Sequence, residues 1–76
     1  MMTQKKAAGI LDSAAARAEV TGRGSPATSR QCWFLAGLIT KIGHDHDLDE
    51  FVIYRKPLSK KTASEMIESY LNDTAN

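Results

Sequence analysis

The sequence predicts an all-α fold in which two core helices, over about residues 29–42 and 59–71, are joined by a long loop containing an extended segment. Three observations support this class: an alanine-rich start with high helix propensity, a capping box at Thr28 and Gln31, and a regular apolar stripe over residues 63–71. With 76 residues, 42% of them hydrophobic, the chain allows only a small core.

The first 25 residues differ in composition from the rest of the chain. Their alanines favour a helix, but Ile10 and Leu11 are the only large apolar side chains on its stripe. The run from Thr21 to Pro26 contains two glycines, a serine and a proline, which predicts a flexible linker that ends this helix. We therefore expect an Ala-rich N-terminal arm or helix and linker over residues 1–25, and a small helical domain over residues 26–76.

The second helix has start and stop signals of its own. The Thr28 side chain can accept from the amide three residues on while the Gln31 side chain reaches back, and Gly43 suits a left-handed C-terminal cap. Trp33 and Phe34 lie off the apolar stripe of this helix. Either the N-terminal helix or an external partner is therefore expected to pack on them.

The connection and the last helix follow from charge and apolar spacing. The His- and Asp-rich residues 44–50 predict an exposed loop, and the apolar residues 51–54 predict an extended or single-turn connector. Ser59 suits the N-cap of the last helix, with Leu58 and Ala63 as a hydrophobic staple, and a frayed polar tail should follow Asn72. The side chains expected to face helix 29–42 are Ala63, Met66, Ile67 and Leu71.

Catalysis and metal binding are not expected. The side chains of residues 44–50 include types that bind zinc, nickel or copper, but nothing in an exposed loop fixes a ligand set. Cys32 lies in the first turn of a helix, where a thiol can be activated, yet no partner motif supports that role and a small, half-buried apolar side chain is the simpler interpretation. We predict a non-enzymatic protein without cofactor.

Charge and hydropathy limit the location and the partners. The formal net charge is +1, too small for a protein that coats nucleic acid by charge alone. The longest charge-free apolar stretch, residues 31–40, is about half of what a bilayer crossing needs, and no signal-peptide pattern follows Lys5 and Lys6. We expect a soluble, cytoplasmic protein that does not enter a membrane.

One dense basic patch stands out, formed by Arg55, Lys56, Lys60 and Lys61. The two lysines open the last helix, where they oppose the helix macrodipole, and together with exposed backbone amides they could hold a phosphate. The acidic segment a few residues upstream would repel a polyanion. Contact with phosphate, contact with a protein and an idle solvated surface all remain open for this patch.

A resemblance covers residues 26–72. Its motifs are T-x-x-Q in the first helix and L-[ST]-x-x-x-A-S-x-x-I in the second, and the matching residues are Thr28, Gln31, Leu58, Ser59, Ala63, Ser64 and Ile67. These resemble a small helical module of phage and bacterial proteins that handle DNA, with a layout similar to SAP-type nucleic-acid-binding domains. The longer connector and the N-terminal arm depart from that pattern. The matching positions are caps and core residues, so the resemblance assigns no binding residue.

Two functions are therefore predicted. The first is a phage-type accessory protein that binds a nucleic acid or a nucleoprotein complex through Arg55, Lys56, Lys60 and Lys61, with Arg30 and Lys41 as further candidates. The second is a stoichiometric inhibitor of a host defence complex, similar in size and composition to anti-CRISPR proteins. The aromatic surface expected to grip such a protein partner consists of Trp33, Phe34, Phe51 and Tyr54.

Overall fold

The computed structural model describes residues 2–22 and 24–75, with side chains up to residue 73. Its elements in chain order are α1 (Gln4–Thr21), α2 (Ser29–Ile42), the 3-10 helix η1 (Asp45–Leu48), the short α3 (Asp49–Val52) and α4 (Lys60–Ala75). Within the described residues the only β-type pairing is an isolated bridge between Pro26 and Ser59. The prediction of an all-α fold is confirmed.

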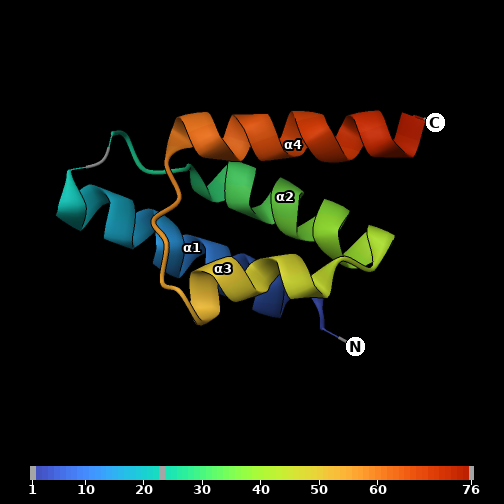
Figure 1. Ribbon diagram of the computed structural model, residues 1–76, viewed down its shortest axis with the longest axis horizontal. Helices are drawn as coiled ribbons and strands as arrows, with labels where there is room; N and C mark the ends of the chain where they lie inside the picture. The colour runs from blue at the N-terminus through green and yellow to red at the C-terminus, as the bar shows by residue number, and fades with distance from the viewer. Residues whose placement is uncertain (1, 23, 76) are drawn as a thin grey trace.

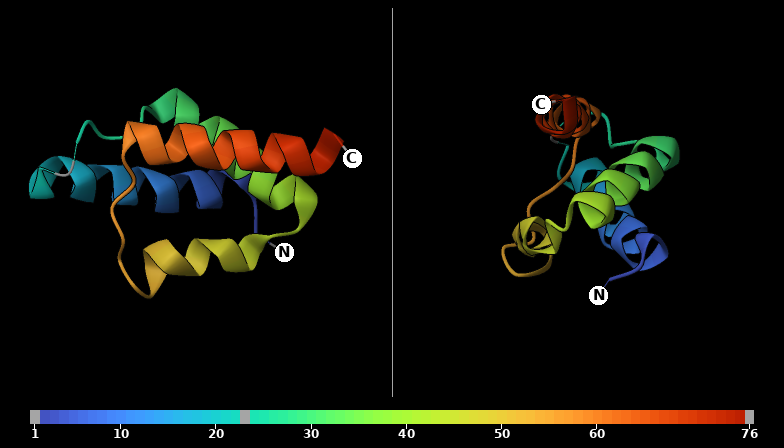
Figure 2. Two further views of the ribbon diagram at one scale, coloured as in Figure 1. Left: turned by 45° about the horizontal axis from the view of Figure 1, so that its top comes forward. Right: turned by 90° about the vertical axis from the view of Figure 1, so that its right-hand side faces the viewer.

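The helices lie roughly along one axis but differ in direction (Figures 1 and 2). Helices α2 and α4 run side by side in the same direction, whereas α1 and α3 run the opposite way. The C-terminal ends of α1 and α3 and the N-terminal ends of α2 and α4 are therefore gathered at one end of the molecule. No helix in the described part of the chain is long and apolar enough to cross a bilayer.

Helix α1 is part of the core that the rest of the chain forms. The Thr3 side chain caps its start by accepting from the Lys6 amide at 3.2 Å, and Gly22 ends it with a φ of 67°. Its inward face carries mostly alanines around the fully buried Leu11, and small side chains let α1 lie close against α2. The boundary predicted after residue 25 thus separates two helices that share one core, and residue 23 lies outside the described part.

Helix α2 follows the sequence signals closely. The Gln31 amide donates to the Thr28 hydroxyl at 3.1 Å and the Gln31 side chain accepts from the Thr28 amide at 3.0 Å, which is the predicted capping box. Gly43 ends the helix with a φ of 85°. Leu35 and Ile39 are fully buried and form the centre of the core.

The connection between α2 and α4 differs in part from the prediction. The predicted exposed loop over residues 44–50 folds into η1 and the start of α3, whereas residues 51–54, predicted as an extended or single-turn connector, begin within the single turn of α3. The cause is the spacing of Leu48 and Phe51, which lie three residues apart on one helical face and are both buried against α1 and α2. Phe51 therefore belongs to the core and not to an aromatic surface, which corrects that expectation.

Helix α4 begins as predicted and runs further. The Ser59 hydroxyl accepts from the Thr62 amide at 3.1 Å, and Leu58 and Ala63 are both fully buried, as the staple requires. The expected frayed tail instead continues the helix to Ala75, while residue 76 lies outside the described part. Leu71, predicted as a core position, is 44% exposed, and the buried position one turn after Met66 is taken by Tyr70.

Candidate functional site

The residues predicted to bind a partner fall on two separate surfaces. Arg55, Lys56, Lys60 and Lys61 lie at the end of the molecule where α2 and α4 begin, with Tyr54 beside them in the chain. Trp33 and Phe34 lie on α2 and line a different hollow. The residues of the first group are close in the sequence, and the fold places further residues from α1 and α2 beside them.

Backbone hydrogen bonds tie together the elements that meet at this end. The Leu58 amide donates to the Ala14 carbonyl of α1 at 2.9 Å, and the Leu58 carbonyl accepts from the Ala27 amide at 3.1 Å. The Lys60 amide donates to the Ser25 carbonyl at 2.7 Å. The residues before α2 and before α4 are thus held against each other and against α1, so the cations carried here sit on a fixed frame.

We call this surface the basic end and define it by five side chains, Arg30, Arg55, Lys56, Lys60 and Lys61, all of them exposed. Among the described residues, none of the five forms an ion pair with a carboxylate. The N-termini of α2 and α4 add the positive ends of two parallel helix dipoles, which the negative ends of α1 and the short α3 at the same end of the molecule partly oppose. The acidic residues near this end are Glu19 in α1, Asp49 and Glu50 in α3 and Glu65 in α4, and the Glu50 carbonyl accepts from the Lys56 amide at 3.1 Å. The five cations of the basic end therefore outnumber the nearby carboxylates by a small margin.

Two carboxylates of the acidic segment, those of Asp45 and Asp47, lie further from the basic end than the sequence suggests. Asp47 accepts from the Tyr70 hydroxyl at 2.6 Å, ten residues into α4 and therefore about 15 Å along the helix from Lys60. Asp45 accepts from the Met2 amide at 3.4 Å, near the start of α1. Because this separation exceeds the Debye length of about 8 Å at physiological salt, the repulsion of a polyanion expected from Asp45 and Asp47 is largely screened at the basic end.

Arg17 is a structural residue of this end that the sequence did not reveal. Its Nη2 donates to the Phe51 carbonyl at 2.7 Å and to the Lys56 carbonyl at 3.2 Å, and its Nε donates to the Arg55 carbonyl at 3.1 Å. One guanidinium thereby fastens the chain between α3 and α4 onto α1. Arg55 has a φ of 52° within this segment, a left-handed conformation that is uncommon for a residue other than glycine.

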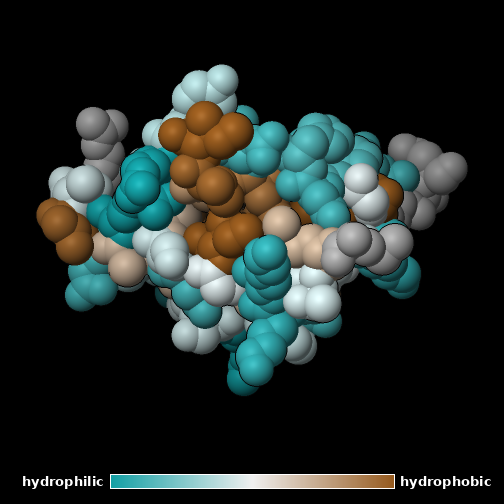
Figure 3. Space-filling view, turned by 90° about the horizontal axis from the view of Figure 1, so that it is seen from below, coloured by the Kyte–Doolittle hydropathy of each residue, from teal (hydrophilic) through white to brown (hydrophobic). Residues whose placement is uncertain are grey.

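Apolar side chains stand beside the cations on the same segment. Val52 and Ile53 are more than half exposed, and Tyr54 is 73% exposed. Figure 3 shows that apolar surface gathers on the face where α3 lies over α1. A hollow of about 210 Å³ between these two helices has Arg17 and Arg55 in its lining. The predicted site residue Tyr54 thus lies on the apolar border of the basic end and is not part of the groove that Trp33 lines.

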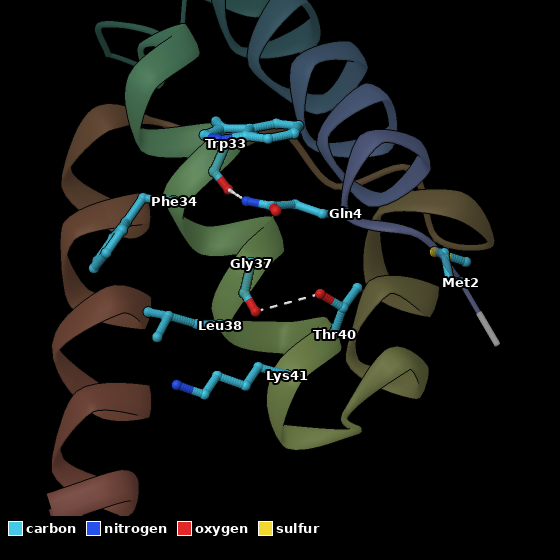
Figure 4. A pocket seen from close by; sticks show the side chains of 8 residues that line it. All are labelled: Met2, Gln4, Trp33, Phe34, Gly37, Leu38, Thr40 and Lys41. Atoms are coloured by element: carbon cyan, nitrogen blue, oxygen red, sulfur yellow. Dashed lines mark hydrogen bonds between the residues drawn. The ribbon is translucent and has the colours of Figure 1, made fainter.

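The second surface is a shallow groove of about 620 Å³ along α2, which we call the α2 groove (Figure 4). Trp33 points toward α1 and Phe34 toward α4, and each is about half exposed. A Cβ at Gly37 would lie 2.7 Å from the Gln4 side-chain nitrogen, which donates to the Trp33 carbonyl at 3.0 Å. The full lining is Met2, Gln4, Trp33, Phe34, Gly37, Leu38, Thr40 and Lys41. Lys41, predicted as a further phosphate contact, therefore lies in this groove.

The His and Asp side chains of the connection interact with one another and with α4. Asp47 contacts the His44 ring at 3.3 Å and the His46 ring at 3.2 Å as well as the Tyr70 hydroxyl. Burial, with a further contribution from the bond to Asp47, raises the pKa of the Tyr70 hydroxyl. Within the described residues no group of three or more His, Cys, Asp or Glu side chains could hold a metal ion.

Cys32 is fully buried, more deeply than predicted. Burial, reinforced by the nearby Asp12, raises the pKa of its thiol to about 12. This increase outweighs any lowering of the thiol pKa by the N-terminus of α2. At neutral pH the thiol is therefore protonated and acts as a core side chain.

Comparison of the chain with protein-family models, with curated proteins and with solved structures finds no match. The resemblance to SAP-type modules stays a prediction from the sequence motifs.

Proposed function

We propose that this protein is a non-catalytic, phage-type accessory protein of the cytoplasm that binds a nucleic acid, alone or within a nucleoprotein complex, through its basic end. The observation that carries the proposal is the convergence of five exposed cations and two helix N-termini on a hydrogen-bonded frame. Lysine and arginine at such a place neutralise phosphates and release counterions, which is the main source of affinity for nucleic acids.

The position of Lys60 and Lys61 supports a role outside the folding of the chain. Both lie in the first turn of α4, where a positive charge opposes the macrodipole and lowers helix stability. A bound phosphate would reverse this effect, because the positive end of the helix dipole and the ammonium groups both favour an anion. Lys60 and Lys61 therefore lower the stability of the free helix and would contribute a favourable interaction once a polyanion is bound.

Charge reversal with a matched control tests the proposal. Lys60→Glu with Lys61→Glu changes the basic end, whereas Lys5→Glu with Lys6→Glu changes the first turn of α1 by the same net charge. Binding of labelled DNA and RNA is followed by fluorescence anisotropy over a salt series. We expect the first pair to abolish binding and the control pair to retain it, and each single Lys→Ala change at the basic end to reduce the logarithmic salt slope by about 1.

Two outcomes would contradict the proposal. Absence of binding to any nucleic acid at low salt would remove it directly. Equal losses from the two charge reversals would show that net charge alone acts and that the basic end is not a site.

A second candidate function uses the α2 groove and a protein partner. Trp33 and Phe34 are held about half exposed on a regular helix, and aromatic side chains are typical anchors of protein interfaces. We propose as the alternative that the chain inhibits a host defence complex by docking through this groove. Trp33→Ala should then cost about 2 kcal/mol or more of affinity, while the lysine reversals in α4 would matter little. A complex captured from host lysate and titrated with both variants distinguishes the two functions.

A further inference from the structure

The segment that links α3 to α4 places an aromatic ring directly beside the cations of the basic end. Tyr54 is 73% exposed and Ile53 is 65% exposed, and Arg55 and Lys56 follow immediately in the chain. With the exposed Val52 before them they form a contiguous apolar surface, and such surfaces on small proteins often mark an interaction site. Because cations adjoin this apolar surface, it suits a ligand that has both an apolar and an anionic part.

Backbone hydrogen bonds hold the turn that carries Tyr54 in one conformation. The Ile53 amide donates to the Asp49 carbonyl at 2.8 Å and the Lys56 amide to the Glu50 carbonyl at 3.1 Å, on either side of the left-handed Arg55. The guanidinium of Arg17 holds three carbonyls of the same turn. Backbone strain that is held so firmly is typical of functional sites. The turn fixes Tyr54 outward, next to the two cations.

The cations continue from this turn along the end of the molecule. The chain from Tyr54 to Lys60 passes from the α3 side of the molecule to the α4 side (Figures 1 and 2). Six residues span at most about 20 Å, so the cations form a short stripe with the tyrosine at one end. Such a stripe can follow several consecutive phosphates of one strand.

Single-stranded nucleic acid has both features that this surface can bind. Its base faces are free to stack on an aromatic ring, and its phosphates can contact the neighbouring cations. In a duplex the base faces are covered by their neighbours, and Tyr54 would gain nothing. We propose that the basic end binds single-stranded nucleic acid in preference to duplex, with a base stacked on Tyr54 and the adjoining phosphates on Arg55 and Lys56. This inference rests on the proposed nucleic-acid binding and specifies its ligand.

The test compares a labelled single strand of about 12 nucleotides with a hairpin duplex of the same length, by fluorescence anisotropy at one salt concentration. We expect the single strand to bind about tenfold more tightly. Tyr54→Ala should reduce its affinity by about tenfold and leave duplex binding unchanged. Tyr54→Phe keeps the ring and should bind normally, whereas Tyr54→Leu keeps an apolar side chain without the ring and should resemble the alanine variant.

Phe34→Ala serves as the matched control, because it removes an exposed aromatic ring of the α2 groove, and we expect it to leave binding unchanged. Equal affinity for the two oligonucleotides, a neutral Tyr54→Ala and loss of binding on reversing Lys60 and Lys61 would together overturn this inference and keep the proposed function. Absence of all nucleic-acid binding would overturn both. A protein complex weakened by Tyr54→Ala, with neither oligonucleotide bound, would assign this surface to a protein.

Discussion

Removal of the Arg17 guanidinium should destabilise the whole fold, although the residue is only partly buried. Its three hydrogen bonds hold the turn after α3 onto α1, and they differ in their access to water. The bond to the Phe51 carbonyl, at 2.7 Å, is partly buried, and a hydrogen bond from a charged donor contributes about 1.5–3 kcal/mol. The bonds to Arg55 and Lys56 are exposed, so water can replace them at little cost.

Arg17→Ala should therefore lower the free energy of unfolding by about 2 kcal/mol, measured by urea denaturation followed by far-UV circular dichroism. A change of this size corresponds to a fall of roughly 10 °C in the melting temperature of a domain this small. Arg17→Lys keeps the charge but lacks the planar fork of donors, and should recover only part of the loss. Arg30→Ala, at an exposed cation of α2, should change stability by less than about 0.5 kcal/mol. A loss below about 0.5 kcal/mol for Arg17→Ala would refute the structural role described for this residue.

Further expectations concern the core, the thiol and the histidines. Leu35→Ala should lower the free energy of unfolding by about 3 kcal/mol because the Leu35 side chain is fully buried. The Ile67 side chain is only partly buried, so Ile67→Ala should lower the free energy of unfolding by about 1–2 kcal/mol in the same denaturant measurement. The Cys32 thiol has an ordinary pKa of 9.0 and a folded pKa of about 12, so the stability it contributes is complete below about pH 9 and is lost as the pH rises toward 12. Cys32→Ala should therefore show a shallower decline of stability across that range, and an unchanged decline would contradict the raised pKa. A chelator should leave the thermal midpoint unchanged, and a clear fall would show that residues 44–50 bind a structural metal.

The helices α2 and α4 could be predicted because their signals are local. The capping box at Thr28, the glycine at position 43 and the serine before α4 act within one turn, and each adopts the geometry that its residue type favours. Propensity and capping therefore locate the start of both helices and the end of α2 without knowledge of the fold. The end of α4 carries no such signal, and the helix runs beyond the predicted boundary.

The connection was predicted less well because two local signals competed there. The β-branched and aromatic residues at 51–54 favour an extended chain, whereas Leu48 and Phe51 favour a helical turn with one buried face. Burial of two large side chains against α1 and α2 outweighs the intrinsic preference of four residues. This packing follows from tertiary structure, which a local pattern does not contain.

Part of the candidate site was accessible from the sequence. Arg55, Lys56, Lys60 and Lys61 are close in the chain, and their charge alone marks them. Arg30 joins them only because α2 and α4 run in the same direction, and Arg17 contacts the turn only because α1 packs against it. Contacts over more than 30 residues of chain carry no signal in a single sequence.

The distribution of charge along the longest axis also affects how the protein meets a partner. A net charge of +1 gives little long-range attraction, but the cations of the basic end are opposed at the other end by Asp45, Asp47, Glu68 and Asp73, which Lys5, Lys6 and Lys41 only partly offset, and this distribution gives the molecule an electric dipole moment. The electric field of a polyanion rotates such a molecule during its approach, so that it meets the polyanion with the N-termini of α2 and α4 in front. Diffusional encounter is thereby biased in orientation more than in rate, and added salt should remove that bias by screening the field over the 35 Å length of the molecule.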